Sequence, residues 1–157
     1  MQTSLNFHGR AVRVMLTPAA EQRAKALDER VLLEVQIYFS CVLVKRVAIY
    51  SDTPQEGAWQ LESAEFDALL AKAQPLTERL YVRFNTVMTK ICPVGDYLGP
   101  PPVSDFKIAR EEAYVPRWLR VDYRDGRWYG DYGWYSSRED ESNTVQIRGA
   151  AVRASAG

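Results

Sequence analysis

The sequence has little of the residue types on which most metal and catalytic sites depend. Its 157 residues include one histidine and two cysteines. A single histidine excludes a zinc site built from several histidines, and it makes any histidine-based triad depend on His8. The motifs Gly-x-Ser-x-Gly, His-Glu-x-x-His, Gly-x-x-x-x-Gly-Lys and Gly-x-Gly-x-x-Gly do not occur. We therefore favour a protein that is not an enzyme and that needs no cofactor.

Three residues, His8, Cys41 and Cys92, are left as candidates for chemistry, and each also has an ordinary structural interpretation. His8 falls within a predicted strand, and Cys41 continues the apolar face of another, as a small buried side chain would. The pair Cys92-Pro93 offers a thiolate that haem accepts, but no second ligand pattern accompanies it. Two distant cysteines, and a first segment without a basic start and an apolar core, predict a cytoplasmic protein with free thiols.

The chain also lacks an excess of either charge, since 20 Lys and Arg balance 20 Asp and Glu. Each third of the sequence is close to balanced as well. Binding to a phosphate backbone usually needs a basic excess, so we do not expect DNA as a partner, and RNA binding is the least favoured alternative. The most apolar stretch, Val31–Tyr50, contains Glu34, Gln36, Lys45 and Arg46. Those side chains are costly in hydrocarbon, so we expect no membrane span.

Hydrophobic periodicity predicts strands and helices in alternation over residues 5–90. Leu5–Leu16 and Leu80–Met88 alternate apolar with polar side chains, which is typical of strands. Thr17-Pro18 has the pattern of a helix N-terminus, in which threonine caps the helix and proline takes its first position. Ser63 is predicted to cap a second helix.

The segment Val31–Tyr50 is longer than one ordinary strand and has no Gly, Pro, Asn or Asp to mark a turn. It forms either two strands that turn near Ser40 or near Lys45-Arg46, or one long bulged strand. Two strands give the order βαββαβ, which is typical of a ferredoxin-like sandwich, where two helices cover one face of an antiparallel sheet. The expected fold class is therefore α+β, with a C-terminal β-hairpin as an extension.

We expect one α+β domain over residues 1–135 and a partly disordered tail over 136–157. Within the domain we distinguish a core at 5–90, a Pro-rich loop at 91–116 and an aromatic hairpin at 117–135. Loops as long as the second segment are uncommon inside compact domains and tend to be functional.

Aromatic residues are concentrated in one segment of the sequence. Eight of the 18 Phe, Tyr and Trp fall between Tyr114 and Tyr135. Asp125-Gly126 is typical of a two-residue type I′ hairpin loop, and it fixes which residues of the flanking strands face each other. One face of the hairpin then points to the core, carrying Leu119, Val121, Tyr123, Trp128, Tyr132 and Trp134.

The opposite face of the hairpin should contact water and is the predicted binding surface. It interleaves aromatic rings with arginines, the residue types favoured at protein interfaces. Its candidate binding residues are Trp118, Arg120, Arg124, Tyr129 and Tyr135, with a cross-strand pair expected between Arg120 and Asp131.

From this surface we expect a small non-catalytic interaction module that binds a protein partner or associates with itself as a homodimer. In one alternative, the Pro-rich loop or the tail covers the surface within the same chain. In the other, the protein is a small-molecule enzyme or ligand sensor, with a pocket between the sheet and the 91–116 loop, over His8 or Cys92.

Overall fold

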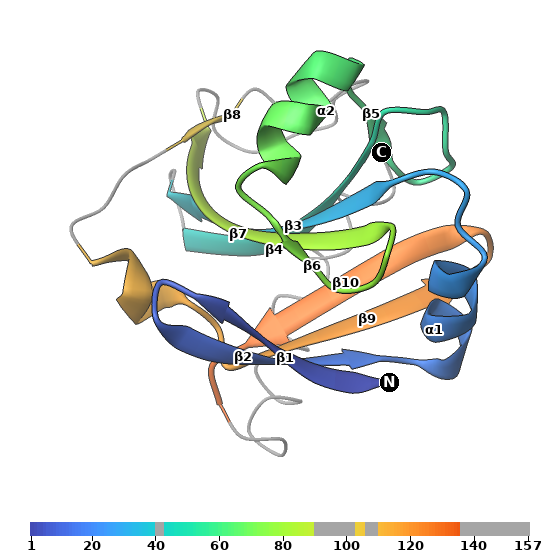
Figure 1. Ribbon diagram of the computed structural model, residues 1–157. Helices are drawn as coiled ribbons and strands as arrows, with labels where there is room; N and C mark the ends of the chain where they lie inside the picture. Colours follow the sequence, from blue (N-terminus) through green and yellow to red (C-terminus); the bar gives the residue numbers. More distant parts are fainter. Residues whose placement is uncertain (40–42, 90–102, 106–109, 136–157) are drawn as a thin grey trace.

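Two β-sheets face each other across the main hydrophobic core of the protein (Figure 1). The computed structural model describes residues 1–39, 43–89, 103–105 and 110–135. Its elements are β1 (Gln2–Phe7), β2 (Arg10–Leu16), α1 (Pro18–Lys25), β3 (Val31–Phe39), β4 (Leu43–Ser51), β5 (Trp59–Gln60), α2 (Ser63–Leu70), β6 (Gln74–Pro75), β7 (Leu80–Thr89), β8 (Val103–Asp105), the 3-10 helix η1 (Glu111–Tyr114), β9 (Trp118–Arg124) and β10 (Arg127–Gly133).

The four-stranded sheet joins the first two strands of the described residues to the last two, in the order β1-β2-β9-β10. The pairs β1–β2 and β9–β10 are antiparallel hairpins. Between them β2 and β9 run parallel, with Arg13 opposite Trp118 and Leu16 opposite Val121. Strands from the two ends of the described chain therefore complete one sheet.

The six-stranded sheet is formed by the middle of the chain, in the order β5-β4-β3-β7-β6, with β8 paired to β7. β3 and β4 are antiparallel, with Phe39 opposite Leu43, which confirms the interpretation of 31–50 as two strands that turn near Ser40. β3 and β7 run parallel, with Val31 opposite Leu80.

Each face of the six-stranded sheet buries a different cluster of side chains. The face toward the other sheet holds the main core, which includes Val35, Val47, Val82, Leu119 and Trp128. The opposite face packs against α2, where the buried residues are Leu32, Ala48, Tyr50, Trp59 and Phe66. Figure 1 shows α2 outside the sandwich and α1 at its end, beside β9. Both helices are short, and within the described part of the chain none has the length and hydrophobicity that crossing a bilayer requires.

The expected ferredoxin-like arrangement is not found, although the α+β content is. Leu5–Leu16 is not one strand, because His8 and Gly9 both have positive φ, 51° and 78°, and turn the chain between β1 and β2. β2 then pairs with β9 in the second sheet instead of joining β3, β4 and β7. Local alternation cannot reveal such a pairing, because its partner lies far along the sequence.

The helix signals are confirmed for α1 and not for the cap of α2. The Ala20 N–H donates to the Thr17 hydroxyl over 3.2 Å, and Pro18 occupies the first helical position. α2 begins at Ser63, so the preceding Glu62 takes the cap position, and it makes no side-chain capping bond.

The β9–β10 hairpin has the register that its turn predicts. Asp125 and Gly126 both have positive φ, 52° and 77°, and Tyr123 lies opposite Trp128 as expected. Its inner face lies on the core, with Trp128 and Tyr132 buried and Tyr123 and Trp134 packed against them as half-buried neighbours. The tail, the proline run 100–102, Cys41 and Cys92 lie outside the described residues.

Candidate binding surfaces

The outer face of the β9–β10 hairpin carries exposed arginines supported by aromatic rings. Strand alternation places Arg120, Asp122 and Arg124 on this face of β9, opposite Asp131, Tyr129 and Arg127 of β10. The Arg124 guanidinium lies 4.4 Å from the centre of the Tyr129 ring, and its Nε is 3.0 Å from an Asp122 oxygen. Tyr135, just after β10, is 53% exposed. Four of the predicted binding residues, Arg120, Arg124, Tyr129 and Tyr135, are therefore at least partly accessible.

Trp118, the fifth predicted residue, is buried, against expectation: 3% of its surface is exposed. Its ring lies over Gly133 on the neighbouring strand, so closely that a Cβ added there would be 2.6 Å from Cζ2. The Arg120 guanidinium lies over the same ring, 5.6 Å from its centre. Trp118 therefore packs beneath Arg120 and is not itself accessible to a partner.

Asp131 pairs with a different residue from the one expected. Its carboxylate lies 3.1 Å from the ammonium of Lys45, a buried side chain from β4 of the other sheet. Lys45 also donates to the carbonyl of Tyr132, and it lies over the Trp118 ring, 5.6 Å from the centre. The sequence does not predict this contact, because it depends on how the two sheets pack.

Arg13 of β2 extends the arginine surface beyond the hairpin. The parallel register puts Arg13 opposite Trp118 and Met15 opposite Arg120, so all four side chains share one face of the sheet. Arg13 is exposed. Sequence reasoning missed it because the β2–β9 pairing has no local signal.

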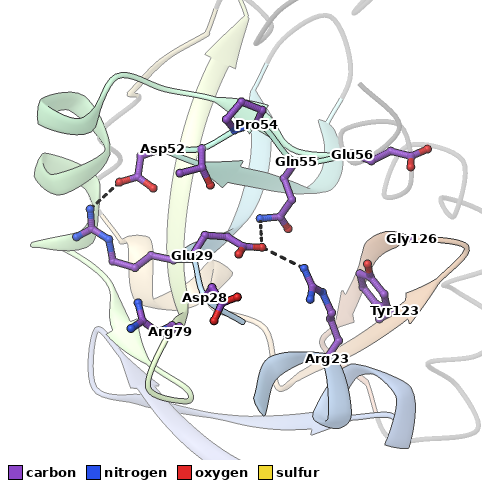
Figure 2. Close-up of a pocket in the computed structure, with 12 residues that line it drawn as sticks. Arg23, Asp28, Glu29, Asp52, Pro54, Gln55, Glu56, Arg79, Tyr123 and Gly126 are labelled. Atoms are coloured by element: carbon purple, nitrogen blue, oxygen red, sulfur yellow. Dashed lines mark hydrogen bonds and ion pairs between the residues drawn. The ribbon is translucent and has the colours of Figure 1, made fainter. Parts of the chain in front are cut away.

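A second surface is an open depression at the end of the sandwich, with a volume of about 840 Å³ (Figure 2). Four segments meet there: the end of α1 with the 28–30 loop, the 52–56 loop, the residue before β7 and the β9–β10 turn. The lining residues are Arg23, Asp28, Glu29, Arg30, Asp52, Thr53, Pro54, Gln55, Glu56, Arg79, Tyr123 and Gly126. None of them comes from the described parts of the 91–116 loop, 103–105 and 110–116, and the rest of that loop, beside which the alternative pocket was expected, lies outside the described residues.

Most charges of the depression are already paired inside the protein. Glu29 accepts hydrogen bonds from Arg23 over 3.0 Å and from Gln55 over 2.9 Å, and Figure 2 shows both converging on it. Arg30 contacts Asp52 at 2.7 Å and Asp67 at 2.8 Å. The hydrogen bond that Arg30 donates to Asp52, reinforced by its contact with Asp67, raises the pKa of Arg30. These pairs hold the walls of the depression in one arrangement.

Two lining charges of opposite sign stand apart from those pairs. Asp28 and Arg79 are both exposed, and no ion pair with another described residue is found for either of them. Sequence reasoning assigned no role to these residues, because charged loop residues are ordinarily solvated. Their common location depends on loops that the sequence does not bring together.

A buried polar cluster lies on the outer face of the six-stranded sheet. Arg83 pairs with Glu34 at 2.7 Å, and Gln36 donates to Glu34 and accepts from Arg46 over 3.0 Å. Burial lowers the pKa of Arg46 to about 10, and it raises the pKa of Tyr50 above its usual 10.0. Because these buried side chains form hydrogen bonds and ion pairs with one another, we regard the cluster as structural.

His8 contacts the segment that precedes β9. Its Nε2 lies 3.1 Å from a carboxylate oxygen of Glu111 in η1, and Thr86 donates to the other oxygen over 3.5 Å. His8 is therefore held by its contact with Glu111, and it lies in the turn between β1 and β2 and not in a strand as expected. No group of three His, Cys, Asp or Glu that could hold a metal ion is found among the residues the structure describes. Comparison of the chain with protein-family models, curated proteins and solved structures gave no match.

Proposed function

We propose that this protein is a non-catalytic binding module that engages a protein partner through the outer face of the β9–β10 hairpin. The observation that carries the proposal is that Arg120 and Arg124 are exposed while each lies over an aromatic ring, Trp118 and Tyr129. A long side chain held in this way loses less conformational freedom when a partner binds it. Arginine and tyrosine also supply much of the binding energy at protein interfaces.

The partner is either a different protein or a second copy of this chain. Both fit a surface that mixes exposed guanidinium groups with the accessible ring of Tyr135. A homodimer would contact the same patch on both copies, which requires arginines to lie next to the carboxylates Asp122 and Asp131 of the other copy. The two cases differ in whether the purified protein associates on its own.

Affinity capture with the tagged full-length chain, together with sedimentation of the purified protein, tests the proposal. We expect the double variant Arg120→Ala/Tyr135→Ala to lose a protein, or a self-association, that the unaltered chain retains. Each truncation should weaken binding about fivefold or more, as expected for interface hot spots. Lys72→Ala, which removes an exposed positive charge just after α2, outside the sandwich, should leave both readouts unchanged. If capture and sedimentation are the same for all three proteins, the proposal is wrong.

A second candidate function is the binding of a small zwitterionic ligand in the depression. Asp28 and Arg79 favour it, because a carboxylate and a guanidinium that form no ion pair with another described residue lie within one concave site. Such a site matches a molecule with an ammonium group and a carboxylate. A thermal-shift and NMR titration with free amino acids and dipeptides tests it. Binding should disappear in Asp28→Asn and Arg79→Gln, and the absence of any response in the unaltered protein would contradict it.

A further inference from the structure

We infer that the partner contacts this surface through an acidic polypeptide segment, which lies across Arg13, Arg120 and Arg124 on the outer face of the four-stranded sheet. This inference rests on the proposed function and adds to it the chemistry of the partner. It also moves the centre of the surface from the hairpin toward β2.

Among the residues that the structure describes, two positive charges on this face, Arg13 and Arg120, have no carboxylate partner, although the whole chain is neutral. Arg13 and Arg120 lie on adjacent strands two register positions apart, and no carboxylate of the described residues pairs with either of them. Like charges that share a sheet face at this spacing repel each other. A partner that brings carboxylates removes that repulsion and gains charge-assisted hydrogen bonds.

The two carboxylates of the same face are already used within the protein. Asp122 accepts a hydrogen bond from the Thr17 hydroxyl over 2.7 Å and lies 3.0 Å from Arg124. Asp131 lies 3.1 Å from the buried Lys45 ammonium and accepts from the Tyr132 N–H. Neither is free to neutralise Arg13 or Arg120.

The guanidinium groups are also positioned to take carboxylates. Arg120 lies over Trp118 at 5.6 Å and Arg124 over Tyr129 at 4.4 Å, measured to the ring centres. A guanidinium that rests on a ring keeps N–H groups at its edge, and these form paired hydrogen bonds with the two oxygens of a carboxylate. Because the arginines span two strands, several carboxylates along one segment can be bound together.

The same observations argue against a nucleic acid. Asp122 and Asp131 are fixed on this face, where they repel phosphates, and the Tyr129 ring is covered by Arg124 instead of being open for a base to stack on. An acidic polypeptide can place its carboxylates between these two aspartates, whereas the charge of a phosphate backbone is continuous.

Fluorescence anisotropy with the full-length protein tests the inference. The probe is a labelled peptide of alternating Glu and Ser, and its matched control has Gln in place of every Glu. We expect the Glu peptide to bind and the Gln peptide not to, with affinity that falls as salt is added. Arg13→Gln and Arg120→Gln should each weaken binding about three- to fivefold. Lys72→Gln, which removes an exposed positive charge just after α2 and away from both candidate surfaces, should have no effect, and Arg120→Lys should give an intermediate loss.

Equal binding by Arg13→Gln, Arg120→Gln and the unaltered protein would overturn the inference, as would tighter binding of a single-stranded oligonucleotide of the same length. Peptide binding that strengthens when the run Glu139-Asp140-Glu141 is neutralised would make that run the occupant, and it would also overturn the inference. If the hairpin variants lose the captured partner but the Glu peptide does not bind, the proposed function stands and the inference of an acidic partner is wrong. If capture is unaffected by the hairpin variants, the proposed function itself fails.

Discussion

Replacing Gly130 by alanine tests how closely β10 packs against the other sheet. A Cβ at Gly130 would lie 2.7 Å, 2.9 Å and 3.0 Å from Cγ1, Cβ and Cγ2 of Val47 in β4. These distances are shorter than van der Waals contact between carbon atoms. Val47 is fully buried, and a β-branched side chain has few rotamers to which it can move. The added methyl must therefore push the two sheets apart or distort one of them.

Two opposing effects determine how Gly130→Ala changes the free energy of unfolding. Overpacking a core costs about 1–3 kcal/mol, while replacing a strand glycine returns about 0.5–1 kcal/mol by restricting the unfolded chain. We therefore expect Gly130→Ala to lower the free energy of unfolding by about 1–2 kcal/mol. Val47→Ala alone should cost about 2–3 kcal/mol, for two buried carbons and the cavity they leave. In the double variant the new methyl group enters that cavity. The double variant should therefore lose about 1–2 kcal/mol less stability than the two single variants lose together.

Urea unfolding, monitored by tryptophan fluorescence, measures the free energy of unfolding of the unaltered protein, the two single variants and the double variant. Trp128 is buried in the same core, so its emission should report loss of the sandwich. Additive costs would refute the reasoning, and so would a Gly130→Ala variant as stable as the unaltered protein, because either result means that the two residues do not touch.

Three further predictions follow from other contacts. Thr17→Ala should cost about 1–2 kcal/mol in urea unfolding, because the α1 cap and a hydrogen bond to β9 are lost, and Thr17→Ser should retain most of both. Arg83→Met should cost about 3–5 kcal/mol, because it leaves the Glu34 carboxylate buried without its 2.7 Å partner; a smaller loss than that of Thr17→Ala would contradict a buried pair. Burial raises the pKa of Tyr50 and Tyr132 above the usual 10.0, so the stability they contribute is complete below pH 10 and is lost at higher pH. Absorbance at alkaline pH should show these two ionising only with unfolding, and their titration in the folded protein would disprove it.

The parts of the fold that short-range chemistry determines could be predicted from the sequence. Asp125-Gly126 determines the turn and hence every pair of the β9–β10 hairpin, because positive φ at two successive positions suits few residues. Thr17 and Pro18 determine the start of α1 for a similar reason. Both signals act over a few residues, so the rest of the fold does not alter them.

The pairing of distant strands could not be predicted in this way. Alternation assigns Val12 and Val14 to a strand face, but it does not tell which sheet that face belongs to, and the ferredoxin-like order was wrong for this reason. The same limit applies to the candidate surfaces. Arg13 joins Arg120 only through the parallel register, and the Trp118 ring is covered in part by Lys45, which comes from the other sheet.

The parallel pairing of β2 with β9 has a consequence for how the protein is made. The Thr17 hydroxyl bonds to Asp122, which lies 105 positions later, and β2 meets its second neighbour in the same place. At ordinary rates of translation β9 emerges about 5–20 seconds after β2. Throughout that interval the β1–β2 hairpin has an unpaired edge in the nascent chain, which is a template for misassembly. Arg10 and Arg13 are exposed on that strand, and charged side chains beside an open edge disfavour its pairing with another chain.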